Sequence, residues 1–237
     1  MKRLADYTPA RVSLGLAGQS VPVKPLLEPR LAHARARDAV HFPLDVQSLR
    51  AEMGARGWTA LSVHSAARNR EEYLRRPDLG RRLDDTSAIR LSAMPKASLV
   101  FVVGDGLSAL AVHRHAVPLL EQVLRRFDSQ ELSPIIVAEQ ARVAIADSIG
   151  ELLDAELSVI LIGERPGLSA PDSLGAYLTW QPKTGRTDAE RNCVSNIHSR
   201  GLTYEQAAYK LGFLITEARR RKLSGIALKE TAGNLLG

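Results

Sequence analysis

Two glycine-containing segments follow short apolar runs and carry side chains suited to ligand binding. The first is GDGLS at residues 104–108. Its two glycines permit a tight turn and close approach by a ligand, Ser108 can cap a helix, and the free amides can receive a phosphate. The spacing matches neither GxGxxG nor GxxxxGK[ST], so neither a dinucleotide nor a P-loop site is indicated. A structural turn and a ligand loop both stay open.

The second segment is GERPG at residues 163–167, where a charged pair follows a run of buried character. Pro166 lacks an amide donor and Gly167 adds backbone freedom, so the loop can present Glu164 and Arg165 into a cleft. An ordinary solvated turn explains the same residues. Both interpretations stay open at this point.

Cysteine and histidine provide little further chemistry. Cys193 is the single cysteine, which excludes an internal disulfide and a cysteine-based metal cluster, and a free cysteine is most often a small buried apolar residue. His113 and His115 point to different sides of a helix, and His198 has no adjacent catalytic partner. The residues alone therefore predict a ligand-binding protein and no particular reaction.

Alternating strands and helices position these segments. Apolar runs at 97–106, 133–139, 157–167 and 176–182 predict buried strands, and 107–127 and 204–225 predict helices. The alternation predicts an α/β fold, a mostly parallel sheet with helices on both faces. Ligands bind such sheets at the carboxyl ends of strands, so the loops 104–108 and 163–167 and the segment 192–201, whose strand pattern is weaker, are expected to share one crevice.

The first part of the chain has a different pattern. Pro9, Gly15, Gly18, Pro22 and Pro25 predict an extended arm over residues 1–30. Helices are expected at 31–40 and 46–57, the second capped by Asp45, with a further charged, helix-prone stretch at 65–83. We divide the chain into a partner-contacting N-terminal arm and helical region, 1–95, and an α/β domain, 96–237.

Charge and hydropathy limit the classes of partner. The net charge of +6 arises in residues 1–90, which hold sixteen Lys and Arg against ten Asp and Glu. These charges are interleaved and aromatic residues make up only 5%, a pattern that does not favour nucleic-acid binding. No apolar run reaches the roughly 20 residues of a membrane-spanning helix, and the N-terminus lacks a signal-peptide pattern. We expect an intracellular protein without a membrane partner.

Several strings in order along nearly the whole chain resemble the small, or light, chain of ethanolamine ammonia-lyase. The combination of GERPGLSAPDSLGAY with CVSNIH is the most specific. The matching strings are TPARVSLG (8–15), LAHARARDAVHFPLD (31–45), GDGLSALAV (104–112), ARVAIADSIGE (141–151), VILIGERPGLSAPDSLGAYLTW (159–180) and NCVSNIHSRGLTYEQAA (192–208).

This resemblance implies a Rossmann-like subunit of an adenosylcobalamin enzyme that converts ethanolamine to acetaldehyde and ammonia by a radical mechanism. The substrate pocket is then expected in a large partner subunit of a hetero-oligomer, so no catalytic residue is assigned here. The histidine motif DxHxxG, by which some cobalamin proteins ligate cobalt, is absent. The family keeps the cofactor's own base on the metal, so no side chain of this chain is expected to bind cobalt.

The resemblance also implies where the cobalamin contacts lie. They fall on Val143, Glu164 and Cys193: an apolar contact, an acceptor for corrin amide N–H groups and a small wall. Residues expected in the same crevice complete the predicted site: Asp105, Arg165, Ser195 and Asn196.

Two further expectations concern location and an alternative function. The similarity begins at once and leaves no room for the N-terminal extension of some relatives, so we expect the protein in the cytoplasm, either free or inside a bacterial microcompartment. The alternative to the lyase subunit is a non-enzymatic α/β binding or scaffold protein that uses its basic N-terminal arm. Salt-sensitive nucleic-acid binding without cobalamin retention would favour that alternative.

Overall fold

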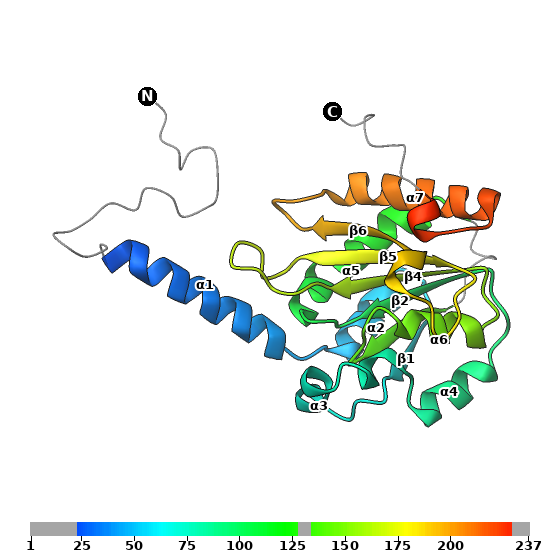
Figure 1. Ribbon diagram of the computed structural model, residues 1–237, viewed down its shortest axis with the longest axis horizontal. Helices are drawn as coiled ribbons and strands as arrows, with labels where there is room; N and C mark the ends of the chain where they lie inside the picture. Colours follow the sequence, from blue (N-terminus) through cyan, green and yellow to red (C-terminus); the bar gives the residue numbers. More distant parts are fainter. Residues whose placement is uncertain (1–22, 128–133, 229–237) are drawn as a thin grey trace.

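Six strands form one mixed sheet in the order β1-β3-β2-β4-β5-β6 (Figure 1). The computed structural model describes residues 23–127 and 134–228. The first four strands of that order run parallel, and β5 and β6 are antiparallel additions. The predicted α/β, mostly parallel architecture is confirmed. The strands are β1 (Ala60–His64), β2 (Leu99–Gly104), β3 (Ile135–Glu139), β4 (Leu157–Gly163), β5 (Leu174–Trp180) and β6 (Arg191–Ile197).

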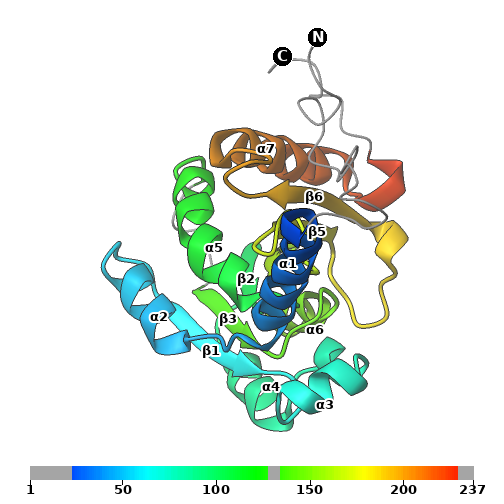
Figure 2. The same cartoon turned by 90° about the vertical axis from the view of Figure 1, so that its left-hand side faces the viewer.

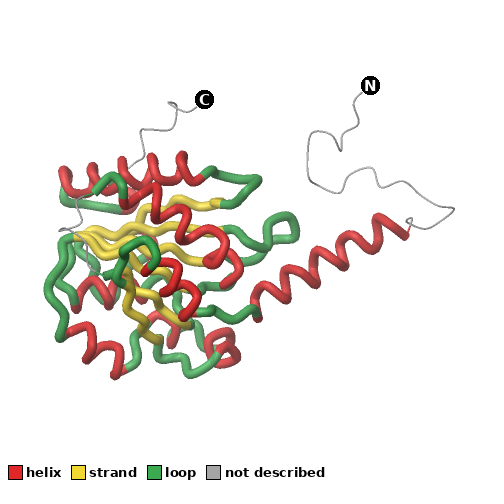
Figure 3. Tube along the Cα trace, turned by 180° about the vertical axis from the view of Figure 1, so that it is seen from behind, coloured by secondary structure: helices red, strands yellow, loops and turns green. Residues whose placement is uncertain are grey.

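Helices cover both faces of this sheet (Figure 3). One face packs against α2, α5 and α7, and the other against α4 and α6. None of the helices in the described ranges is long and apolar enough to cross a membrane. The helices are α1 (Val23–His41), α2 (Val46–Gly54), α3 (Arg70–Arg75), α4 (Asp85–Ser92), α5 (Ala109–Leu124), α6 (Ile145–Leu152) and α7 (Tyr204–Arg221), with 3-10 turns at Leu79–Arg81, Asp188–Glu190 and Gly225–Ala227.

The central strands are buried on both sides because their residues are apolar throughout. Every residue of β2 and β4 is buried. Phe101 packs with the α5 and α7 cluster, whereas Val100 and Val102 pack with the α6 cluster, following the two-residue period of a strand. The second face is less covered beyond β4: Tyr177 of β5 is half-buried and Cys193 of β6 is exposed.

The four predicted strands and the helices of 107–127 and 204–225 are confirmed within a few residues. The segment at 192–201 contains a strand, β6, over its first part. One strand was missed: β1 joins the edge of the sheet beside β3, although its residues lie in the region that we assigned to helices. The stretch 65–83 holds only the short helix α3 and a 3-10 turn.

The expectation of an extended arm is wrong for residues 23–30, which open α1, and the rest of that arm lies outside the described residues. Pro25 stands in the first turn, where backbone N–H groups have no helical partner, so a proline there costs little. Pro29 lies inside the helix and is accommodated. Asp45 caps α2 as predicted, its carboxylate accepting from the Ser48 amide at 2.9 Å.

The carboxyl ends of the parallel strands meet at the edge of the sheet from which α1 projects (Figures 1 and 2). The loop between β4 and β5 reaches out at the same edge (Figure 1). The chain leaves β2 into α5 on one face and β3 into α6 on the other. Loops that part in this way leave a crevice between them, which is the usual place for a ligand in an α/β sheet.

Candidate functional site

A hollow of about 440 Å³ lies at this carboxyl edge. It combines the loops after β2, β3 and β4 with one side chain from α3 and one from β5. Three predicted site residues line it together: Val143, Glu164 and Arg165. The complete lining is Tyr73, Gly106, Leu107, Arg142, Val143, Ile162, Gly163, Glu164, Arg165 and Tyr177.

The two glycine segments form the floor by packing backbone against backbone. The Leu107 amide donates to the Gly163 carbonyl at 2.9 Å. Gly106 has a φ of +56°, and a Cβ there would lie 2.1 Å from the Gly163 oxygen. A Cβ on Gly163 would lie 2.1 Å from the Ser108 carbonyl oxygen. Both positions therefore require glycine, and Ser108 caps α5 as predicted by accepting from the Ala111 amide at 3.3 Å.

Asp105 is not among the residues that line the hollow, and it is only 2% exposed. Its carboxylate accepts from the Ala141 amide at 2.7 Å and from Arg70 at 3.1 Å. Arg70 also donates to the Gly106 carbonyl and, at 2.7 Å, to the carbonyl of Val40 in α1. Burial raises the pKa of Asp105 to about 6, against the opposing effect of Arg70. Asp105 thus ties two crevice loops and α1 together from within the structure.

Glu164 is held at the end of β4 with one oxygen engaged. The Ser173 hydroxyl donates to Oε2 at 2.5 Å, and the Asn196 amide donates to the same oxygen at 3.3 Å. Within residues 23–127 and 134–228, Oε1 receives no hydrogen bond. Glu164 therefore keeps an acceptor available beside the hollow.

Cys193 lies on β6 opposite Tyr177 of β5, which lines the hollow. It is exposed, so the expectation of a small buried residue is wrong, and its thiol interacts with the Tyr177 hydroxyl. Partial desolvation raises the pKa of this thiol, so it is no activated nucleophile. Ser195 and Asn196 line a second hollow with Cys193, of about 360 Å³, and the contact between Asn196 and Glu164 connects the two.

Sequence reasoning missed two residues of the first hollow. Tyr73 is fully buried, and its hydroxyl donates to the Ala141 carbonyl at 3.0 Å. The Arg142 guanidinium lies over the Tyr73 ring, 4.3 Å from its centroid. Arg142 directly precedes Val143, so its place in the matched string was a usable signal, whereas Tyr73 lies far away in the chain and gave none.

Histidines take no part in this hollow. His113 accepts from the Asp45 amide at 3.0 Å, and His115 contacts the Tyr204 hydroxyl at 2.8 Å, so the two serve separate helix contacts. Among the residues that the structure describes, no group of three or more His, Cys, Asp or Glu could hold a metal ion.

Comparison with known proteins gives one consistent result. The family model "Ethanolamine ammonia-lyase light chain (EutC)" matches residues 1–229. A protein of Xanthomonas campestris pv. campestris named ethanolamine ammonia-lyase small subunit is 54% identical over 99% of this chain and 89% of its own length. Small subunits of Ralstonia nicotianae and Pseudomonas aeruginosa are 54% and 52% identical over 97% of the chain, covering 87% and 86% of theirs. The chain belongs to the ethanolamine ammonia-lyase light chain family.

Proposed function

We propose that this chain forms one wall of the adenosylcobalamin site of ethanolamine ammonia-lyase, with Val143, Glu164 and Cys193 as its principal contacts. One observation carries the proposal. Val143 and Glu164, which are 21 residues apart in the chain, line one hollow, and Cys193 lies opposite Tyr177, which lines the same hollow. As a small subunit, the chain works in a hetero-oligomer with the large subunit.

The residues present fit the cofactor. The corrin ring carries amide side chains around an apolar rim, and the hollow offers the free Oε1 of Glu164 beside the apolar Val143. Its volume of about 440 Å³ suits peripheral groups of the cofactor, while the open side leaves the rest to a partner. Arg165 lines this hollow, and Ser195 and Asn196 line the second hollow, as secondary contacts; Asp105 acts by positioning the loops.

Adenosylcobalamin supplies the radical chemistry when it is bound, and the protein supplies position and electrostatics. The role of this chain is then to hold and orient the cofactor and to exclude water from one side of it. Tyr177 and Cys193 form a neutral wall, because both pKa values are raised by desolvation. Membership of the lyase family leaves no support for the alternative of a scaffold that uses a basic arm.

The protruding helix α1 is the proposed arm for the large subunit. It extends away from the sheet (Figure 1), and Ala39 is its one buried side chain among those described. Val23, Leu27 and Leu31 recur every four residues on one stripe and are 53% exposed or more. An isolated helix of this length is marginal in water, so a partner surface that covers this stripe would stabilise it.

The arm is tested by the double variant Leu27→Asp/Leu31→Asp. Since a buried leucine contributes about 1.5–3 kcal/mol, the affinity for the large subunit should fall by roughly a hundredfold or more. Ile89→Asp, on α4 and 69% exposed, is the matched control and should leave the affinity unchanged. Unchanged affinity of the double variant would remove α1 from the interface.

The cofactor wall is tested with Glu164→Ala in the assembled complex. Glu164→Ala should weaken cobalamin retention roughly tenfold, because a hydrogen bond to a charged acceptor is lost. Glu121→Ala, which loses only surface contacts with Arg56 and Arg125, should retain cobalamin normally. Equal retention by the two variants would exclude Glu164 from the site.

For location, we propose the cytoplasm, free or inside a microcompartment. The single cysteine fits a reducing compartment. Fractionation of cells that express both subunits, followed by immunodetection of this chain, distinguishes free protein from protein that sediments with shells.

A further inference from the structure

We propose that Arg142, assisted by Arg165, forms an anion subsite that binds the phosphodiester group of the cofactor's nucleotide tail. This inference rests on the proposed cobalamin wall and assigns a particular part of the cofactor to the hollow of Tyr73, Arg142 and Glu164.

Arg142 is held in place by its surroundings. Its guanidinium lies over the ring of Tyr73, and its amide donates to the Gly80 carbonyl at 2.7 Å. A Cβ on Gly80 would approach the Arg142 Cγ to 2.9 Å, so the stem of the side chain is closely packed. Because the stem and the ring contact fix the guanidinium, little side-chain entropy remains to be lost on binding.

Among the residues that the structure describes, no carboxylate pairs with the charge of Arg142. In the described parts of the chain its guanidinium makes no hydrogen bond or ion pair, and its Nε is buried without an acceptor. Arg70, whose guanidinium also lies over the Tyr73 ring, has Asp105 at 3.1 Å. A buried donor without an acceptor is costly, so a site that leaves one open is suited to a ligand that supplies the acceptor.

The balance of charge in the hollow points to an anion. Arg142 and Arg165 both line it, and no ion pair joins Arg165 to a carboxylate among the described residues. Glu164 is the one carboxylate in the lining, and it already accepts from Ser173. The hollow therefore carries an excess of positive charge.

Among the groups of cobalamin that extend from the corrin, the amide side chains are neutral and the phosphodiester is anionic. A planar guanidinium matches two phosphate oxygens at once, which makes phosphate the stronger ligand for Arg142. A contact with an amide carbonyl instead is the alternative that the experiment must separate.

The experiment compares two ligands on the assembled complex: cyanocobalamin, and dicyanocobinamide, which lacks the nucleotide tail and its phosphate. Arg142→Met should weaken binding of cyanocobalamin by roughly tenfold to a hundredfold and leave binding of dicyanocobinamide unchanged. The loss should shrink at high salt, and Arg142→Lys should recover part of it. Arg50→Met, an exposed arginine of α2, is the control and should bind both ligands as the wild type does.

Equal weakening for both ligands would overturn the phosphate assignment in favour of a corrin contact, and no weakening would remove Arg142 from the site. Thermal unfolding of the Arg142→Met complex at the wild-type temperature shows that the variant is folded. If Glu164→Ala retains cobalamin normally while Arg142→Met does not, the phosphate subsite stands and the proposed Glu164 contact fails.

Discussion

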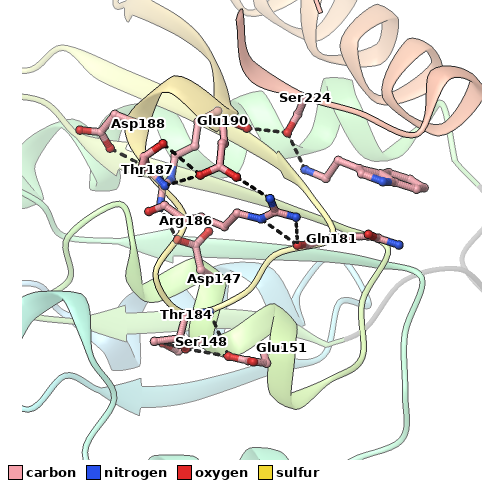
Figure 4. A network of polar contacts seen from close by, with 12 residues as sticks. Asp147, Ser148, Glu151, Gln181, Thr184, Arg186, Thr187, Asp188, Glu190 and Ser224 are labelled. Atoms are coloured by element: carbon pink, nitrogen blue, oxygen red, sulfur yellow. Dashed lines mark hydrogen bonds and ion pairs between the residues drawn. The ribbon is translucent and has the colours of Figure 1, made fainter. Parts of the chain in front are cut away.

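Arginines lie at both edges of the sheet, but at the carboxyl edge two of them, Arg142 and Arg165, have no carboxylate partner among the described residues. Where β5 ends and β6 begins, Arg191 forms an ion pair with Asp147, and the two residues are 7% and 1% exposed. Arg186 and Glu190 form a second pair there (Figure 4). At the carboxyl edge, Arg142 and Arg165 line a hollow without a carboxylate partner among the described residues.

This difference separates arginines that hold the fold from arginines available to a ligand. Removing one partner of a buried pair leaves an uncompensated charge, so the first edge is committed to stability. At the second edge the loops are fixed by glycine packing and by Asp105, which leaves Arg142 and Glu164 free to bind. The predictions below alter one edge at a time.

The largest effect is expected from Gly163→Ala. The added Cβ would lie 2.1 Å from the Ser108 carbonyl oxygen and 2.6 Å from the Asp105 carbonyl oxygen, so the floor of the crevice cannot close. Thermal unfolding of the assembled complex should show the variant folding poorly or with a Tm lower by roughly 15 °C or more. Gly54→Ala, with nothing within 4 Å, is the control and should unfold at or above the wild-type temperature. A normal Tm for Gly163→Ala would contradict the account of the floor.

Arg191→Met should come next and should separate the two edges. It leaves Asp147 buried without its cation, and we expect a loss of about 3–5 kcal/mol in the free energy of unfolding, measured by denaturant titration. Arg142→Met should cost little stability because it breaks no ion pair. The affinity of the complex for cobalamin should fall in Arg142→Met and change little in Arg191→Met. Similar losses of stability in both variants would abolish the distinction between the edges.

Most of the sheet could be predicted from the sequence because β2 and β4 are apolar throughout and therefore lack ambiguity. The strand β1 was missed because it is short and only partly buried, which weakens its pattern. The sequence predicts helix α1 only in part, because prolines usually interrupt helices, although Pro25 stands in a first turn, where it is tolerated.

The candidate site was only partly predictable for a different reason. The family strings led to Val143 and Glu164, which the structure brings to one hollow. The partner of Arg142 is Tyr73, and no local pattern reveals a contact between residues so far apart. Asp105 was expected in the crevice because its loop is there, but its side chain turns to internal amides.

Asp105→Asn should change the pH dependence of stability. Burial raises the pKa of Asp105 to about 6 when folded, against roughly 3.9 when unfolded. Between these values the folded chain keeps a proton that the unfolded chain releases, so this carboxyl makes the free energy of unfolding fall as pH rises from 4 to 6. The variant should lack that contribution, up to about 1.4 kcal/mol per pH unit. Denaturant titrations of the wild type and the variant at pH 4.5 and 5.5 measure it. The same change in the free energy of unfolding between these pH values in both proteins would contradict it.

The smallest effect is expected from Ser173→Ala, which removes the hydroxyl that holds Glu164 Oε2. Losing one positioning hydrogen bond costs about 1 kcal/mol, so cobalamin affinity of the complex should fall roughly fivefold with stability nearly unchanged. Ser169→Ala, an exposed serine in the same loop, is the control. If both serine variants bind cobalamin equally, Glu164 needs no positioning by Ser173.

The most direct test of the cobalamin wall is a structure of the assembled complex with the cofactor bound. The account predicts that Glu164 Oε1 accepts a hydrogen bond from a corrin amide, that Val143 and Cys193 contact the cofactor, and that the Arg142 guanidinium meets the phosphodiester. A cofactor bound by the large subunit, with the hollow of Val143 and Glu164 facing solvent, would contradict it.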